Sequence, residues 1–150
     1  MTTFYSGQNG RLVIDGTNAA KVTNWSISTS QSPLSTTVLS ETDNTFINGV
    51  RSTTGSCRLY YYDDTSGTTR TNSAASLVEK LIKARSGTDA GKAADPENVT
   101  FKLQAVEGNV IREIVVEALI TSASMAMGVG EVMSADVAFQ VNGAPTTVSL

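Results

Sequence analysis

The amino-acid sequence offers few side chains from which a catalytic site could be built. It contains no histidine, the commonest general base and the commonest metal ligand of proteins. A Ser–His–Asp or Cys–His arrangement is therefore excluded, and a zinc ion would lack the clustered cysteine and histidine ligands that it prefers. We expect a protein without enzyme activity and without a cofactor.

Cys57 is the only cysteine, so no disulfide can form within the chain. In an expected β-strand, Cys57 lies on the same face as Leu59 and Tyr61, and this pattern favours a thiol buried among apolar neighbours. A buried thiol is a poor nucleophile, because burial disfavours the reactive thiolate. We expect Cys57 to be a packing residue.

Two pairs of acidic residues could be read as chemical sites. Asp63 and Asp64 are adjacent, but they lack the ligand spacing of a calcium loop and are typical of a solvated turn. Glu113 and Glu117 lie in a stretch with strand character, so they share one face of a strand. Neither pair predicts a metal site or an acid–base site.

Length and charge restrict the protein further. The chain has 150 residues, the size of one domain, a formal net charge of −3 and a pI near 4.8. It has no basic run for nucleic acid or an anionic membrane, no apolar run long enough to span a membrane, and no export signal of the usual kind. We expect one domain over residues 1–150 that binds neither DNA nor membranes.

Most of the chain has the alternating pattern of β-strands. The expected strands are 11–15, 21–29, 51–62, 99–107, 109–120 and 133–141. The first two strands are expected to pair as a hairpin, and the turn at Gly108-Asn109 predicts a second hairpin. The last strand places Val137 and Phe139 on an apolar face, with Asp136 on the polar face.

One helix interrupts the strands. Residues 73–85 carry an apolar stripe at helical spacing that includes Leu77 and Leu81, and Gly87 follows where a C-terminal cap is expected. The order of strands, one helix and more strands predicts a mostly β fold. We expect a β-sandwich or barrel with this α-helix packed on the outside.

Two segments are candidates for contacts outside the domain. Residues 1–10 form either a frayed terminus or an arm that docks through Phe4 and Tyr5. Residues 31–48 form a long polar loop or two irregular edge strands around a turn, and ordering so long a segment is costly without a partner. The candidate inter-subunit residues are Phe4, Tyr5, Leu34, Val38, Leu39, Thr42, Asp43, Asn44 and Phe46.

Four segments give the chain a resemblance to the bacteriophage tail tube family, whose fold is shared with the tube proteins of contractile injection systems. They are the early strand at 22–28 with Trp25, the polar loop, glycine turn and aromatic strand at 43–61, the helix at 73–85, and the closing strand at 130–143. The resemblance is one of layout and covers nearly the whole chain.

The resemblance implies a structural subunit of a hollow tube. Subunits of this family form homohexameric rings that stack into a conduit for the genome, and the sheets of a ring join into one barrel. Implied partners are other copies of the chain, a sheath or terminator protein and the baseplate hub, while DNA passes without specific binding. The implied location is the virion tail, after assembly in the host cytoplasm.

Acidic and polar side chains on the later strands are candidates for the wall of the bore. An acidic wall would repel DNA phosphates over a range set by the salt concentration. The candidates are Glu113, Glu117, Asp136 and Gln140. The alternative is that they lie on the outer wall of the tube, where they would only aid solubility.

A different class of function stays open. A small ligand-binding β-barrel or lectin-like module would need an aromatic or apolar cavity, which Trp25, Tyr60 and Tyr62 could line if the fold brought them together. An enzyme that uses carboxylates alone, such as a glycosidase, would need two acids facing one cleft. Ring or tube formation at high protein concentration separates the first hypothesis from these.

Overall fold

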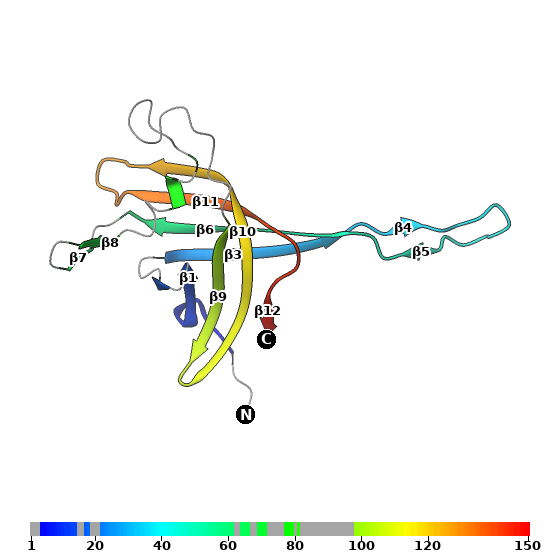
Figure 1. The fold of residues 1–150 in the computed structure, drawn as a ribbon, viewed down its shortest axis with the longest axis horizontal. Coiled ribbons are helices and arrows are strands. Elements are labelled where there is room, and N and C mark those ends of the chain that lie inside the picture. Colours follow the sequence, from blue (N-terminus) through cyan, green and yellow to red (C-terminus); the bar gives the residue numbers. More distant parts are fainter. Residues whose placement is uncertain are drawn as a thin grey trace.

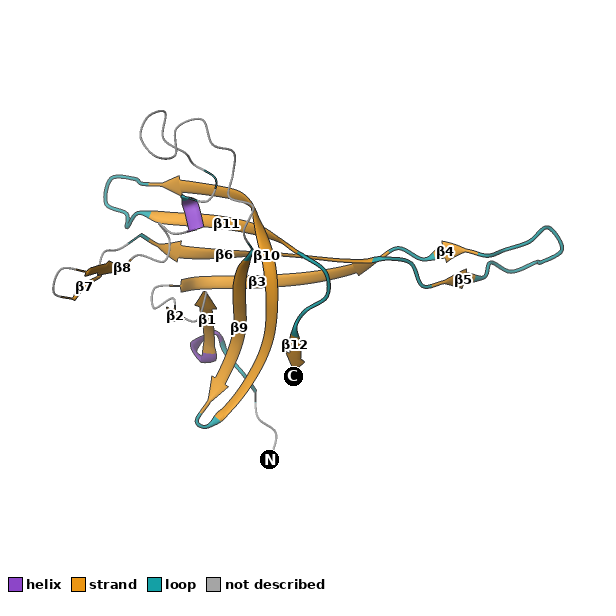
Figure 2. Cartoon of the chain, in the orientation of Figure 1, coloured by secondary structure: helices purple, strands orange, loops and turns teal. Residues whose placement is uncertain are grey.

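The computed structural model consists of β-strands, with short helical turns between some of them (Figure 2). It describes residues 4–14, 17–18, 22–61, 64–66, 69–71, 77–79, 81 and 98–150. The elements are a 3-10 turn η1 (Gly7–Asn9) and strands β1 (Gly10–Ile14), β2 (Thr17–Asn18), β3 (Val22–Gln31), β4 (Leu34–Ser35), β5 (Phe46–Ile47), β6 (Arg51–Tyr60), β7 (Asp64–Ser66), β8 (Thr69–Thr71), β9 (Val99–Glu107), β10 (Val110–Ala126), β11 (Ser134–Val141) and β12 (Thr147–Ser149).

Eight of these strands form one antiparallel sheet in the order β2-β1-β9-β10-β11-β6-β3, with β12 pairing the first part of β10. The sheet bends, so that β1 and β9 run across the direction of β3, β6 and β11 (Figure 1). The mostly β prediction is confirmed. The described residues contain no ladder that joins β1 to β3, so the sheet does not close into a barrel there.

The long strand β10 belongs to both halves of the bent sheet. Its first part pairs β9 and its last part pairs β11, with a register shift between Ile120 and Ser122. The extra residue, Thr121, is a β-bulge, which bends a strand and moves the following side chains to the other parity. Val116, Ala118 and Ile120 face the core before the bulge, and Ala123 and Met125 pack against it afterwards. The expected end of this strand at residue 120 is therefore wrong.

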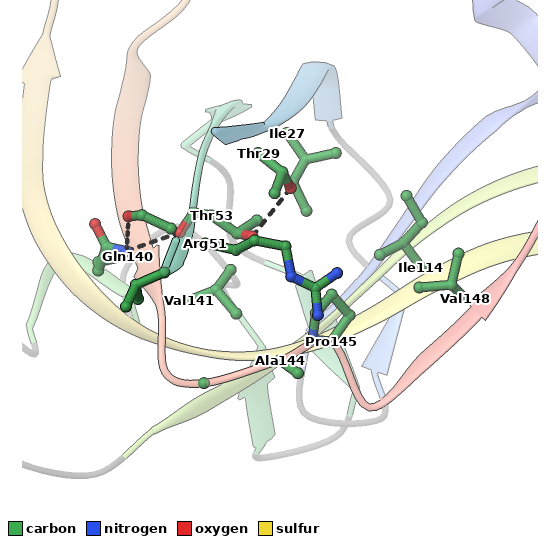
Figure 3. Close-up of a pocket in the computed structure, with 13 residues that line it drawn as sticks. Ile27, Thr29, Arg51, Thr53, Ile114, Gln140, Val141, Ala144, Pro145 and Val148 are labelled. Carbon is green, nitrogen blue, oxygen red and sulfur yellow. Dashed lines mark hydrogen bonds between the residues drawn. The ribbon is translucent and has the colours of Figure 1, made fainter. Parts of the chain in front are cut away.

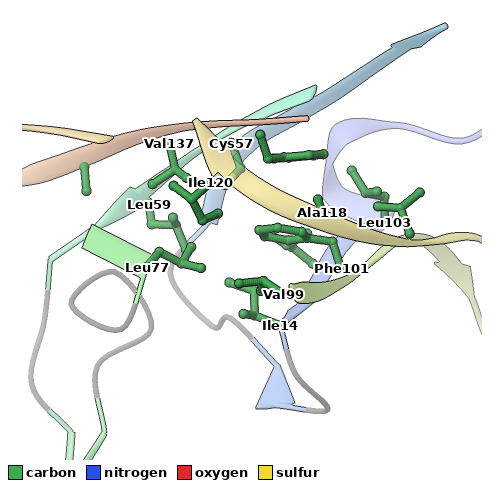
Figure 4. Packing of buried hydrophobic residues seen from close by; sticks show 14 of the residues in the cluster. Ile14, Cys57, Leu59, Leu77, Val99, Phe101, Leu103, Ala118, Ile120 and Val137 are labelled. Carbon is green, nitrogen blue, oxygen red and sulfur yellow. The ribbon is translucent and has the colours of Figure 1, made fainter. Parts of the chain in front are cut away.

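The core lies inside the bend, where both halves of the sheet contribute side chains (Figure 4). Phe101 of β9 and Phe139 of β11 stack there, with ring centroids 4.5 Å apart and an interplanar angle of 16°. Gly55 of β6 pairs Phe139, and a Cβ at Gly55 would lie 2.4 Å from that ring. The glycine therefore leaves room for the aromatic side chain that covers it.

The two predicted hairpins have different outcomes. The β9–β10 hairpin is confirmed, with Glu107 paired to Val110 and Gly108 at φ 57°. The predicted pairing of the first two long strands, β1 and β3, is wrong, because β1 pairs β2 and β9, whereas β3 pairs β6. The alternation in these strands is correct, but the partner of β1 lies far along the chain.

The predicted helix at 73–85 lies mostly outside the described residues. Leu77 and Val78 have helical conformation and are buried in the core. Leu81 packs against the same core, and its amide N–H donates to the Val78 carbonyl at 3.1 Å. These three members of the predicted apolar stripe therefore contact the sheet core.

The segment between β3 and β6 extends away from the sheet as a long hairpin (Figure 1). We call residues 32–50 the arm. Strands β4 and β5 pair Leu34 with Ile47 and Ser35 with Phe46. Of the two expectations for this region, irregular strands around a turn are the observed form.

Candidate assembly surfaces

The arm is held by polar contacts between its two sides. The Thr36 amide donates to the Thr45 carbonyl at 2.8 Å, and the Thr45 amide donates to the Thr37 hydroxyl at 2.9 Å. The Glu41 carboxylate accepts from the Val38 amide and from the Thr45 hydroxyl, each at 3.2 Å. These bonds shape the tip of the arm without a buried apolar core beneath it.

The apolar side chains of the arm are exposed. They are Leu34, Val38, Leu39, Phe46, Ile47 and Val50. Leu39 is 108% exposed and Val50 is 88% exposed. Exposed apolar side chains on a projecting element make the arm a candidate interaction surface.

The candidate inter-subunit residues fall into two separate places. Thr42, Asp43 and Asn44 lie exposed at the tip of the arm, together with the apolar candidates of the same segment. Phe4 and Tyr5 are exposed before η1, which leads into β1, and β1 lies away from the arm (Figure 1). The structure therefore offers two surfaces, and their roles in assembly remain predictions.

The side of the sheet away from the core is polar over β3, β6 and β11. Ser26 and Ser56 hydroxyls lie 3.0 Å apart across β3 and β6. On β6 and β11, Arg58 Nε lies 3.8 Å from Asp136 Oδ1, and Arg58 also donates to the Ser134 hydroxyl at 3.2 Å. The Arg58–Asp136 pair is about half exposed, so it contributes little stability.

The four candidate bore residues share this outer side of the sheet. Asp136 and Gln140 alternate with the buried residues of β11, and Glu113 and Glu117 alternate with the core-facing residues of β10. The register places Leu119 opposite Gln140, so the outward-facing residues of the two strands lie on the same side of the sheet. A common face is thus present, and whether it lines a bore remains a prediction.

These four residues differ in their contacts. Gln140 Nε2 donates to the Thr53 carbonyl at 2.9 Å, which ties β11 to β6. Glu113 Oε2 accepts from Gln104 Nε2 at 2.6 Å, and Gln104 Oε1 accepts from Arg11 Nε at 2.7 Å. This row crosses β1, β9 and β10. Glu113 and Gln140 therefore hold strands together, whereas Glu117 is exposed.

The chemical candidates have structural explanations where the structure describes them. Burial, together with the smaller effect of the nearby negative charge of Asp136, raises the pKa of the Cys57 thiol to about 12. Cys57 is thus a neutral packing residue at physiological pH. The side chains of Asp63 and Asp64 lie outside the described residues.

The described part of the chain contains no group of three or more Cys, Asp or Glu side chains arranged to hold a metal ion. None of its helices is long and apolar enough to cross a membrane.

A groove at the base of the arm was not predicted from the sequence. It encloses about 670 Å³ between the first residues of β6, the end of β11 and the carboxy-terminal segment (Figure 3). Its lining residues are Ile27, Thr29, Val50, Arg51, Ser52, Thr53, Ile114, Gln140, Val141, Gly143, Ala144, Pro145 and Val148. They come from distant parts of the sequence, so no local motif reveals the groove.

The aromatic cavity that a ligand-binding module would need is not formed by the described residues. Trp25 lies opposite Cys57, whose side chain faces the core, so Trp25 is on the core side of the sheet. Tyr60 lies opposite Ser134 and follows the buried Leu59 in β6, so it is on the other side. The two aromatic side chains therefore lie on opposite sides of the sheet. Tyr62 lies outside the described residues.

Comparisons with known proteins establish the fold. No protein-family model matches the sequence, and no curated protein matches it. A chain of the native gene transfer agent virion superposes with a TM-score of 0.64 at 18% identity, covering 93% of this chain and 95% of that chain. The tail of the empty gene transfer agent particle, refined with C6 symmetry, gives a TM-score of 0.63 at 18% identity, with 96% and 98% covered.

A bacteriophage structure has the same fold. The SPP1 tail tube, determined by solid-state NMR and cryo-electron microscopy, superposes with a TM-score of 0.64 at 13% identity, covering 97% of this chain and 80% of that chain. Three structures from virion tails or particles thus match almost the full length of this chain. The chain therefore has the fold of a phage tail tube protein.

Proposed function

We propose that this protein is the subunit of a phage tail tube. Six copies form a ring, and the rings stack into a hollow conduit that delivers the genome. The observation that carries the proposal is the full-length similarity to an SPP1 tail tube and to a tail of C6 symmetry. Exposed apolar residues on a projecting arm support it independently of that similarity.

Ring formation would use the open edges of the bent sheet. Among the strands that the structure describes, β3 has a hydrogen-bonded neighbour on one side only, β6, so its other side can pair with a second chain. An unpaired edge is an aggregation hazard in a monomer and a means of assembly in a symmetric ring. In this proposal the sheets of six subunits complete one barrel around the bore, with the 73–85 helix outside it.

Stacking would use the arm. Its residues 35–42 carry Val38 and Leu39 away from the subunit to which they belong, where they reach the adjacent ring. A sheath or terminator protein and the baseplate hub are the further partners, in a virion tail that assembles in the host cytoplasm. DNA passes through the bore without specific binding, since the chain is acidic and has no basic run.

Deleting Ser35 to Thr42 tests this function. The deletion removes the arm tip and leaves the core residues in place, so the variant should fold with the wild-type melting temperature. Wild-type protein should form rings and tubes at high concentration, seen by analytical ultracentrifugation and negative-stain microscopy, and the variant should form no long tubes. A wild-type protein that stays monomeric overturns the tube function, and normal tubes from the variant overturn the stacking role of the arm.

A further inference from the structure

The connection between β10 and β11 is an exposed apolar turn. We call residues 127–132 the apical turn. Met127 is 71% exposed, Val129 is 108% exposed and Val132 is 64% exposed. A hydrogen bond from the Glu131 amide to the Gly128 carbonyl at 3.1 Å closes the turn. Glu131 is its only charged residue, so the apical turn presents three apolar side chains and one carboxylate.

The groove at the base of the arm has complementary chemistry. Its walls include the apolar side chains of Ile27, Val50, Ile114 and Val148. Arg51 is its only charged lining residue, and its guanidinium extends over the groove toward the segment of Ala144 and Pro145 (Figure 3). Within the described part of the chain, Arg51 has no ion-pair partner.

The apical turn and the groove lie at opposite ends of the same strands. β11 begins at Ser134, one residue after the apical turn, and ends at Val141, which lines the groove. In Figure 1 the β10–β11 connection lies on the left and the arm extends to the right. A turn therefore cannot enter the groove of its own subunit, but it can reach the groove of a second copy placed end to end.

We propose that the apical turn of one subunit docks into the groove at the arm base of a subunit in the next ring, with Glu131 paired to Arg51. The proposal rests on the proposed tube function and names the contact between the rings. Burial of apolar surface would drive the association, and the one opposite charge on each side would set its orientation. Each subunit keeps one free turn and one free groove, as a repeating head-to-tail contact requires.

The groove and the arm would then act on the same neighbour. Val50 belongs to the arm and also lines the groove, so the two surfaces are continuous. A subunit of the next ring would be held by the arm along its side and by the groove at its apical turn. The two contacts have distinct residues and can be tested separately.

Charge exchange tests the docking. Arg51→Glu and Glu131→Arg should each raise the protein concentration at which tubes form by roughly tenfold or more, since each places like charges together in a desolvated contact. The double variant restores opposite charges and should form tubes within roughly threefold of the wild-type concentration. Both residues are exposed, so circular dichroism and melting should match the wild type. Glu107→Arg reverses an exposed charge at the β9–β10 turn and is the matched control, which should assemble normally.

The outcomes separate the docking from the tube function. Wild-type tubes together with normal assembly of Glu131→Arg overturn the docking alone, as does a double variant that assembles no better than the single variants. Val129→Cys combined with Val50→Cys provides a second measurement, because oxidation of assembled tubes should link neighbouring subunits into covalent ladders. Ladders support the contact, and their absence in well-formed tubes overturns it. Failure of the wild type to assemble overturns the tube function and the docking together.

Discussion

The bent sheet and the arm that connects its strands β3 and β6 are stabilised in different ways. In the sheet, alternate side chains such as Leu59 enter a core from which water is excluded. In the arm the same antiparallel pairing continues, but hydroxyl and backbone hydrogen bonds replace the core. A hydrogen bond contributes about 0.5–1.5 kcal/mol net, and a buried large apolar side chain about 1.5–3 kcal/mol. The sheet therefore supplies the buried core of the fold, whereas the arm presents exposed apolar side chains that we propose for binding to other subunits.

The largest effect on stability is expected at the centre of the core. Phe139→Ala removes the ring that stacks on Phe101 and covers Gly55, so it should lower the free energy of unfolding by about 3–5 kcal/mol. Urea unfolding followed by circular dichroism measures this loss. Phe46→Ala in the arm removes the same side chain from an exposed site and should change stability by less than about 0.5 kcal/mol. Equal losses from the two variants would remove the distinction between sheet and arm.

A smaller loss is expected where the predicted helix meets the sheet. Leu81 packs against the core cluster, so Leu81→Asp should place a carboxylate in an apolar contact at a cost of about 2–3 kcal/mol. Thermal unfolding reports the change. Glu79→Ala, at an exposed neighbouring position, is the control and should melt as the wild type does. An unchanged melting temperature for Leu81→Asp would mean that this contact adds nothing to the fold.

Local patterns in the sequence predicted the parts of the fold that depend on local chemistry. The turn at Gly108-Asn109 predicts the β9–β10 hairpin, and strict alternation predicts which side of β11 is buried, because both signals act over a few residues. The pairing of β1 with β9 brings together residues far apart in the chain, and strand periodicity carries no information about such a partner. The bulge at Thr121 hides the last part of β10 for a related reason, since it breaks the alternation that marks a strand.

Among the candidate surfaces, too, local sequence predicts one and not the other. The exposed apolar residues of the arm follow from a long polar segment in which Leu34, Val38 and Leu39 have too few apolar neighbours to form a core. The groove could not be predicted, because its walls come from β3, β6, β10, β11 and the carboxy-terminal segment, which are adjacent only after the sheet has bent.

Gly49 and Gly55, which are close in the sequence, provide a direct test of the different roles of the arm and the sheet. A Cβ at Gly49 would lie 1.9 Å from the Ser32 carbonyl oxygen at the arm base, whereas a Cβ at Gly55 would meet the ring of Phe139 in the core. Gly49→Ala should distort the arm and impair tube formation, with a stability loss below about 1 kcal/mol, because the arm can open locally. Gly55→Ala should lower stability by about 1–3 kcal/mol.

Paired measurements of melting and assembly decide between these expectations. If Gly49→Ala melts far below the wild type, the arm is part of the cooperative core and its separate role is wrong. If Gly49→Ala forms normal tubes, the precise geometry of the arm base is not needed for stacking.

The smallest effect on stability is expected on the outer polar side of the sheet, where the candidate bore residues lie. Glu117 and Asp136 are exposed, so Glu117→Lys combined with Asp136→Lys should change the free energy of unfolding by less than about 1 kcal/mol. Glu113 is excluded from this test because its carboxylate accepts the hydrogen bond from Gln104, and its loss would disturb the row across β1, β9 and β10.

The functional effect of this charge reversal depends on which wall the side chains occupy. Asp136→Lys also leaves Arg58 without its acidic partner, so a wall built from these strands would become strongly basic. If that wall lines the bore, variant tubes should retain DNA or slow its ejection, and the effect should grow at low salt, where the Debye length rises from about 10 Å at 0.1 M to about 30 Å at 0.01 M. Ejection rates from particles carrying the variant, measured at two salt concentrations, provide the readout. Glu117→Gln with Asp136→Asn removes the charges without reversing them and should have a weaker effect in the same direction. A normal ejection rate for the charge-reversed tubes in low salt would place these residues on the outer wall, where their charge serves solubility alone.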